Sequence, residues 1–153
     1  MTARVYVPKD STAVSLGADA VAAVFAAHGF DVVRTGSRGL LWLEPLVEVD
    51  TPDGRIGYGP VAAGEVASLI TAGIASGGSH PRCIGPVERH PYLASQQRLT
   101  FRRAGIVDPA SLTDYINHGG YAGLRNALAM SGADIVQAVT DSGLRGRGGA
   151  AFP

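Results

Sequence analysis

The chain has 153 residues, of which 46% are hydrophobic and 17% charged, and its 13 basic and 13 acidic side chains cancel. A neutral chain offers no electrostatic case for nucleic acid, no apolar run approaches the roughly 18 residues of a membrane span, and the start lacks a signal-peptide pattern. The single cysteine, Cys83, excludes an internal disulfide, a zinc site with several cysteines and a cysteine-ligated iron–sulfur cluster. A soluble, cytoplasmic chain without a metal cluster of its own is therefore expected.

The charges are unevenly distributed along the chain. Residues 1–80 hold five basic and eight acidic groups, whereas residues 81–153 hold eight arginines and five acids, so the net charge changes from −3 to +3. This change of sign predicts two units of different character.

A strand–helix–strand pattern opens the chain. Arg4–Pro8 alternates as a strand does, and Ala18–Ala27 carries apolar residues at helical spacing before Gly29, a C′ cap. Phe30–Arg34 follows as a second strand, expected to be parallel to the first.

Two further strands and a helix complete the first part. Leu46–Asp50 and Arg55–Tyr58 flank the turn signal Thr-Pro-Asp-Gly at 51–54, and Val61–Ala72 has the spacing of a helix. Residues 1–75 therefore have the order βαβ, ββ, α, which is the thioredoxin-like pattern. The expected fold class is α/β.

The second part is predicted to be a linker followed by helices. Residues 76–97 show little periodicity and are interpreted as an interdomain linker, and Leu99–Arg102 is compatible with one short strand. Residues 98–153 are expected to be mainly helical. Three helices are expected, with start signals at Asp108-Pro109, Ser111-x-x-Asp114 and Ser131-x-x-Asp134. Gly119-Gly120 separates the first helix from the second, Tyr121–Met130, and the last helix stops at Gly143.

Four glycines and two arginines lie within the eleven residues Gly143-Leu-Arg-Gly-Arg-Gly-Gly-Ala-Ala-Phe-Pro153. Glycines let backbone N–H groups approach an anion, and arginines add charge-assisted contacts. The stretch follows a helical pattern rather than a strand and has no Gly-Lys-Ser/Thr, so it is neither a dinucleotide fingerprint nor a Walker loop. From residue chemistry alone, a phosphate cradle and a flexible polar terminus both stay open.

These eleven residues resemble the flavin-binding opening of the NADH-oxidising flavoprotein subunits of respiratory complex I, NAD-reducing hydrogenases and NAD-dependent formate dehydrogenases. The preceding sequence is also similar to them at Arg98–Phe101, Gly105–Pro109 and Asp114–Tyr121. In those subunits the loop wraps the FMN phosphate. The resemblance therefore implies that the complete subunit binds FMN through Gly146, Arg147, Gly148 and Gly149.

Residues 1–75 resemble the thioredoxin-like ferredoxin module that often precedes such subunits. Ser37 and Leu41 stand where those modules have cysteines, and there is no cysteine near residues 10–18. The resemblance therefore implies a thioredoxin-like domain that has lost its [2Fe–2S] cluster.

Within this family, Glu44-Pro45, Val47–Val49 and Gly57–Pro60 are most similar to the beta (diaphorase) subunit of the molybdenum, NAD-dependent formate dehydrogenases. The complete subunit would then pass electrons from formate through iron–sulfur clusters and FMN to NAD, holding FMN, NAD and a [4Fe–4S] cluster. None of these is expected on the 153 residues alone. The implied partners are a molybdopterin and iron–sulfur catalytic subunit and a [2Fe–2S] thioredoxin-like subunit.

Two alternatives stay open. In the first, the chain is part of the flavoprotein subunit of an NAD-reducing hydrogenase or NADH:quinone oxidoreductase. In the second, it is a non-catalytic thioredoxin-like assembly module. Because it ends at Pro153, where the flavoprotein body would begin, it is expected to be inactive by itself. Arg98, Arg102 and Arg103 are interpreted as a solvated face, with docking to an acidic partner subunit as the alternative.

Overall fold

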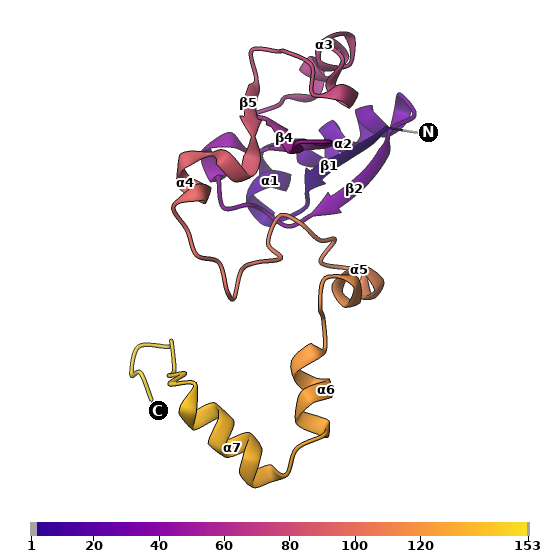
Figure 1. Ribbon diagram of the computed structural model, residues 1–153. Coiled ribbons are helices and arrows are strands. Elements are labelled where there is room, and N and C mark those ends of the chain that lie inside the picture. Colours follow the sequence, from indigo (N-terminus) through magenta and orange to yellow (C-terminus); the bar gives the residue numbers. More distant parts are fainter. Residues whose placement is uncertain (1–2, 153) are drawn as a thin grey trace. The chain divides into compact units, whose positions relative to one another are not determined.

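The computed structural model describes residues 3–152, and the chain divides into two compact units, Met1–Tyr115 and Ile116–Pro153. The first unit contains a sheet with helices, and the second contains helices followed by the glycine-rich loop (Figure 1). Within residues 3–152, no helix has the length and apolar character needed to cross a membrane.

One five-stranded sheet organises the first unit, in the spatial order β2-β1-β3-β4-β5. The strands are β1 (Arg4–Pro8), β2 (Asp31–Thr35), β3 (Val47–Thr51), β4 (Gly54–Tyr58) and β5 (Cys83–Pro86). β1 and β2 are parallel, and the three remaining pairs of neighbouring strands are antiparallel. The predicted parallel pair, the hairpin and the α/β class are confirmed.

The helices α2 (Ala18–Ala27) and α3 (Val66–Thr71) share the main core with one face of this sheet (Figure 1). The buried positions of α2 follow a three-to-four spacing, and Gly29, with φ +81°, ends the helix as predicted. A short helix, α1 (Ser11–Ser15), was not anticipated, and Asp10 caps it by accepting hydrogen bonds from the Thr12 and Ala13 N–H groups. The core consists of Val5, Val7, Ala13, Ala18, Val21, Ala22, Phe25, Val47, Val49, Tyr58, Val61, Val66, Leu69 and Ile74.

The opposite face of the sheet is polar at its centre. Because side chains alternate along a strand, Val47 and Val49 reach the main core while Glu48 lies on the other face, opposite Tyr6 of β1. A second, smaller core is formed by Leu40 and Leu46, which precede β3, and by Val87 and Leu93, which follow β5. Glu48 is buried on this face, with an exposed fraction of 3%.

The segment predicted to be a linker, residues 76–97, is instead built into the first unit. β5 extends the sheet, and the helix α4 (Pro91–Ala94) follows it after a 3-10 turn at Val87–Arg89. No periodicity reveals β5, because Cys83-Ile-Gly-Pro86 is short and contains two residues that disfavour strands. The strand considered at Leu99–Arg102 is also wrong, since these residues form turns.

Two of the predicted helix starts are confirmed. The Ser111 and Ser131 hydroxyls accept hydrogen bonds from the Asp114 and Asp134 N–H groups, at 3.1 and 3.2 Å. Asp108-Pro109 precedes the helix α5 (Leu112–Asn117) instead of starting it. In the second unit, α6 (Ala122–Leu128) and α7 (Gly132–Asp141) contain no buried residue.

Candidate functional site

The glycine-rich loop follows directly from the end of α7. Gly143, with φ +63°, turns the chain out of the helix. The Gly146 N–H then donates to the Phe152 carbonyl at 2.7 Å, which closes residues 146–152 into a ring of backbone. Gly149 has φ +118°, a value that side-chain-bearing residues rarely adopt. The glycine at 149 is therefore required by the backbone itself.

Three of the four predicted phosphate ligands have accessible backbone donors. A Cβ at Gly148 or Gly149 would meet no heavy atom within 4 Å. Among residues 3–152, no protein acceptor takes the N–H groups of Arg147, Gly148 or Gly149, so they can receive a ligand. Gly146 differs, because its N–H is already bonded to Phe152. The structure thus leaves the 147–149 N–H groups as the accessible donors.

The charge of the loop suits an anion. Arg145 and Arg147 are exposed, and within the described part of the chain neither guanidinium forms an ion pair. Residues 142–152 contain no carboxylate. Donor N–H groups and unpaired cations fit a phosphate, and the resemblance implies that the phosphate is that of FMN.

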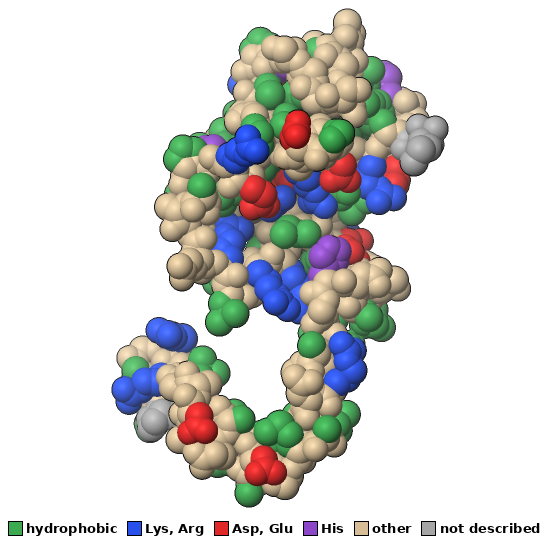
Figure 2. Space-filling model, in the orientation of Figure 1, with side chains coloured by type: hydrophobic (Ala, Val, Ile, Leu, Met, Phe, Trp, Pro, Cys, Tyr) green, Lys and Arg blue, Asp and Glu red, His purple; other side chains and the backbone are tan. Residues whose placement is uncertain are grey.

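A hollow of about 480 Å³ adjoins the start of this loop on the surface of α7. It is lined by Ile135, Val136, Val139, Thr140, Gly143, Leu144 and Arg145. Figure 2 shows hydrophobic, basic and acidic side chains at the surface of this second unit. The loop therefore combines accessible N–H donors and positive charge with an apolar surface next to it.

Ser37 and Leu41 occupy the positions where the resemblance would place cysteine ligands of a [2Fe–2S] cluster, and Ser37 is hydrogen-bonded to Glu44. The Ser37 hydroxyl donates to Glu44 Oε1 at 2.8 Å, and the Leu46 N–H donates to Glu44 Oε2 at 2.8 Å. Leu41 is half exposed and offers no donor. Cluster irons in such modules need thiolates. This donor set does not fit a [2Fe–2S] cluster.

Glu44 is 3% exposed and its carboxylate lacks a cationic partner within residues 3–152. Burial raises the pKa of Glu44, and the charges of Asp10 and Glu48 raise it further, although its two hydrogen bonds act in the opposite direction. Asp10 Oδ2 is also buried and has no hydrogen-bond partner in the described residues. The position thus contains two poorly compensated carboxyl groups.

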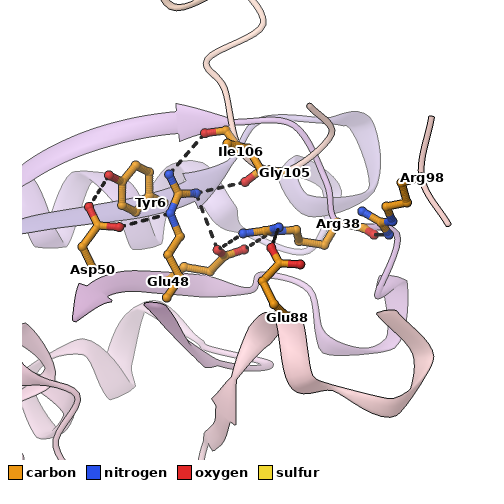
Figure 3. Close-up of polar contacts among 9 residues, drawn as sticks. Tyr6, Arg38, Glu48, Asp50, Glu88, Arg98, Gly105 and Ile106 are labelled. Carbon is orange, nitrogen blue, oxygen red and sulfur yellow. Dashed lines mark hydrogen bonds and ion pairs between the residues drawn. The ribbon is translucent and has the colours of Figure 1, made fainter. Parts of the chain in front are cut away.

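A buried ionic network, missed by the sequence reasoning, crosses the polar face of the sheet (Figure 3). Arg38, 3% exposed, binds Glu48 through two hydrogen bonds of 2.8 and 2.7 Å and also pairs with Glu88. Arg55 approaches Glu48 at 3.6 Å and lies over the Tyr6 ring, 3.4 Å from its centroid. The signal was available in the sequence: Glu48 stands between two core valines, and a buried carboxylate requires a cation.

Two hydroxyl groups of the first unit donate hydrogen bonds to backbone carbonyls. The Ser68 hydroxyl donates to the Glu65 carbonyl, so its proton is not offered to His80, whose Nε2 lies 3.1 Å away. Tyr58 donates to the Gly78 carbonyl at 2.7 Å, and burial raises the pKa of Tyr58 to about 12. These groups position backbone rather than activate a nucleophile.

Comparison with known proteins gives partial relatives. The chain is 52% identical over 58 residues to the NADP-reducing hydrogenase subunit HndC of Solidesulfovibrio fructosivorans, covering 38% of this chain and 12% of that one. It is 58% identical over 43 residues to a subunit of the NADH-quinone oxidoreductase of Streptomyces coelicolor, covering 28% and 10%. It is 42% identical over 66 residues to the corresponding subunit of the Escherichia coli enzyme, covering 42% and 13%. No family model matches the chain.

The chain thus spans only 10% to 13% of the length of these curated relatives. All three are subunits of NADH- or NADP-linked oxidoreductases by name, and none is a formate dehydrogenase. The comparisons therefore support the broader resemblance to NADH-oxidising flavoprotein subunits, and they favour the hydrogenase or quinone-reductase alternative over formate dehydrogenase.

Proposed function

We propose that this chain is the N-terminal part of the flavoprotein subunit of a multisubunit NADH- or NADP-linked oxidoreductase, of the hydrogenase or quinone-reductase type. The observation that carries the proposal is the loop at 143–152, with accessible N–H groups and two exposed arginines that form no ion pair within residues 3–152. The partial relatives add support, because both named kinds belong to this class of enzyme. In the complete subunit the loop holds the FMN phosphate.

FMN, when bound, supplies the hydride and electron chemistry of such a subunit. The residues of this chain bind and orient it. The N–H groups of Arg147, Gly148 and Gly149 donate to phosphate oxygens, and the Arg147 guanidinium adds a charge-assisted hydrogen bond. Gly146 contributes by closing the ring onto Phe152, so its role is to shape the loop.

Residues 1–75 of the first unit are proposed to be a thioredoxin-like module without a cluster, ahead of the flavoprotein lead-in at 98–153. The βαβ, ββ, α order and the β2-β1-β3-β4 arrangement support this proposal. So does the Ser37–Glu44 pair at the expected cluster position. Iron analysis of the purified chain tests it, and a stoichiometric [2Fe–2S] signal in the electron paramagnetic resonance spectrum would refute it.

Formate as the electron donor is a second proposal that competes with the hydrogenase or quinone-reductase type, and it rests on Glu44-Pro45, Val47–Val49 and Gly57–Pro60. The test is the composition of the complex purified through a tag on the complete subunit. A molybdopterin subunit supports formate as the donor, and a nickel–iron or iron-only hydrogenase subunit refutes it.

A matched set of loop variants tests the FMN site in the complete subunit. Gly149→Val is expected to abolish flavin binding, because φ at 149 disfavours a branched side chain. Arg147→Ala should weaken it by about 1.5–3 kcal/mol, the contribution of one charged hydrogen bond. Gly123→Ala, at a helical glycine with open space around it, is the control. Normal flavin content in both loop variants would contradict the assignment.

A further inference from the structure

Residues 98–106, named here the pinned loop, are fixed to the first unit at both ends by arginines. At one end, Arg98 donates to the Arg38 carbonyl at 2.7 Å. At the other, Arg55 donates to the Gly105 and Ile106 carbonyls at 3.2 and 3.3 Å. Figure 3 shows both attachments beside the Arg38–Glu48 pair. The loop is therefore held in one place on the polar face of the sheet.

The attachment is close-fitting at Gly105. This residue is buried with φ +77°, and a Cβ there would collide with the Arg38 side chain. Arg38 is itself held by Glu48 and Glu88. Within the loop, the Ala104 N–H donates to the Phe101 carbonyl at 3.0 Å, which closes a turn. The middle of the pinned loop is thus preorganised.

This fixed loop exposes large apolar side chains. Leu99 is 84% exposed and Phe101 is 71% exposed, although both stand on backbone anchored to a buried network. Exposed aromatic and leucine side chains on a rigid segment are typical of a binding surface, because little conformational entropy is lost when a partner covers them. Exposure of the Leu99 and Phe101 side chains to solvent does not stabilise the first unit.

The segment that carries these side chains is basic in sequence, and the neighbouring Glu88, 66% exposed, is paired with Arg38. Residues 89–107 contain four arginines and no carboxylate. Arg98 is engaged with the Arg38 carbonyl and Gln96, whereas Arg89 and Arg102 are exposed. A surface of this kind is complementary to an apolar pocket with a carboxylate rim.

We propose that the pinned loop docks a partner subunit of the oxidoreductase, inserting Leu99 and Phe101 into an apolar pocket that is bordered by Asp or Glu side chains facing Arg102. The inference rests on the proposed role as a subunit of a larger complex. It adds an interface that lies outside the FMN loop and does not require flavin to be bound.

Photo-cross-linking in the complete complex tests the proposal. Phe101→p-benzoylphenylalanine is introduced into the tagged complete subunit, and the irradiated complex is analysed by mass spectrometry. The expected product joins position 101 to another subunit, at a segment with carboxylates beside apolar residues. The same substitution at Leu16, a 54% exposed leucine elsewhere in the first unit, is the control and should not yield that product. A product within the same polypeptide or with a second copy overturns the proposal.

Retention of the partner gives the second readout. The double variant Leu99→Ser/Phe101→Ser should weaken association with the cross-linked subunit by about 100-fold, as truncation of central apolar anchors does. Arg102→Glu should slow association by about tenfold at low salt, with a smaller effect at high salt. Flavin content should be unchanged in all variants, and Leu16→Ser should behave as wild type. Unchanged retention in the double variant overturns the proposal.

The FMN assignment and the docking surface can be refuted independently of each other. A complex that contains no flavin but still gives the intersubunit product refutes the FMN assignment alone. A flavin-loaded complex in which position 101 reaches only its own polypeptide refutes the docking surface alone.

Discussion

The two units of this chain contain similar sequence signals but bury very different amounts of side chain. The first unit has two apolar cores and a buried ion pair, and its strands and helices contact each other across long sequence separations. In the second unit, α6 and α7 have well-defined starts and ends, yet Leu124, Leu128, Val136 and Val139 are all exposed. Caps and periodicity specify where a helix forms, whereas packing supplies most of its stability. The helices α6 and α7 therefore form without burying their apolar side chains, unlike the helices that share the core of the first unit.

The buried pair in the first unit should give the largest effect on stability. Arg38→Met removes both hydrogen bonds that Arg38 donates to the buried Glu48 and leaves only Arg55, 3.6 Å away, to balance its charge, so we expect the free energy of unfolding to fall by about 3–5 kcal/mol. Replacing both residues, Arg38→Met/Glu48→Met, should cost less than the single change, because no charge is then left alone. Urea unfolding of the chain measures both.

The matching change in the second unit is Arg125→Met, at an exposed position of α6. It should alter the free energy of unfolding by less than about 0.5 kcal/mol. Equal effects at positions 38 and 125 would remove the contrast between the units.

Two glycines with the same backbone angle isolate the contact beneath the pinned loop. Gly85 and Gly105 both have φ +77°, but a Cβ at Gly85 meets nothing within 4 Å, whereas one at Gly105 collides with Arg38. Gly105→Ala should therefore lower the free energy of unfolding by about 1–3 kcal/mol more than Gly85→Ala does, the cost of overpacking. Thermal unfolding of the two variants provides the comparison, and equal losses would show that the contact is not tight.

The smallest effect is expected at Glu44 and depends on pH. Its pKa is raised in the folded chain, so the folded state binds more protons than the unfolded state as pH rises above the ordinary value near 4.5. The contribution of Glu44 to stability is therefore lost with rising pH. Glu44→Gln keeps an acceptor for the Leu46 N–H and does not titrate at this position. The free energy of unfolding of the variant, relative to that of wild type, should therefore increase from pH 4 to pH 7.

Denaturant unfolding at a series of pH values follows this difference. A constant difference between Glu44→Gln and wild type, or one that shrinks as pH rises, would show that Glu44 is not disfavoured in its charged form.

Local signals predicted much of this architecture. The Thr51–Gly54 turn located the β3–β4 hairpin, and the hydroxyls of Ser111 and Ser131 marked two helix starts, because each depends on residues close in sequence. β5 was missed because it exists only by pairing with β4, more than twenty residues earlier. The same reason hid the Arg38 network, whose partners are distant in the chain.

The sequence predicted where the candidate site lies, but not all of the hydrogen bonds within it. The density of glycine and arginine identified the loop, and Gly149 has the backbone angle that explains one of these glycines. The hydrogen bond from Gly146 to Phe152 could not be foreseen, because it depends on how the loop closes. It reduces the predicted set of accessible backbone donors to residues 147–149.

Binding of FMN and riboflavin to the complete subunit tests the central claim most directly. The two ligands share the ring system and differ in the phosphate, the group assigned to Arg147, Gly148 and Gly149. Calorimetric titration should show one FMN per subunit and riboflavin binding that is weaker by about tenfold or more, since each charged hydrogen bond contributes about 1.5–3 kcal/mol. Equal affinity for FMN and riboflavin, or no binding of either, would contradict a phosphate cradle at residues 143–152.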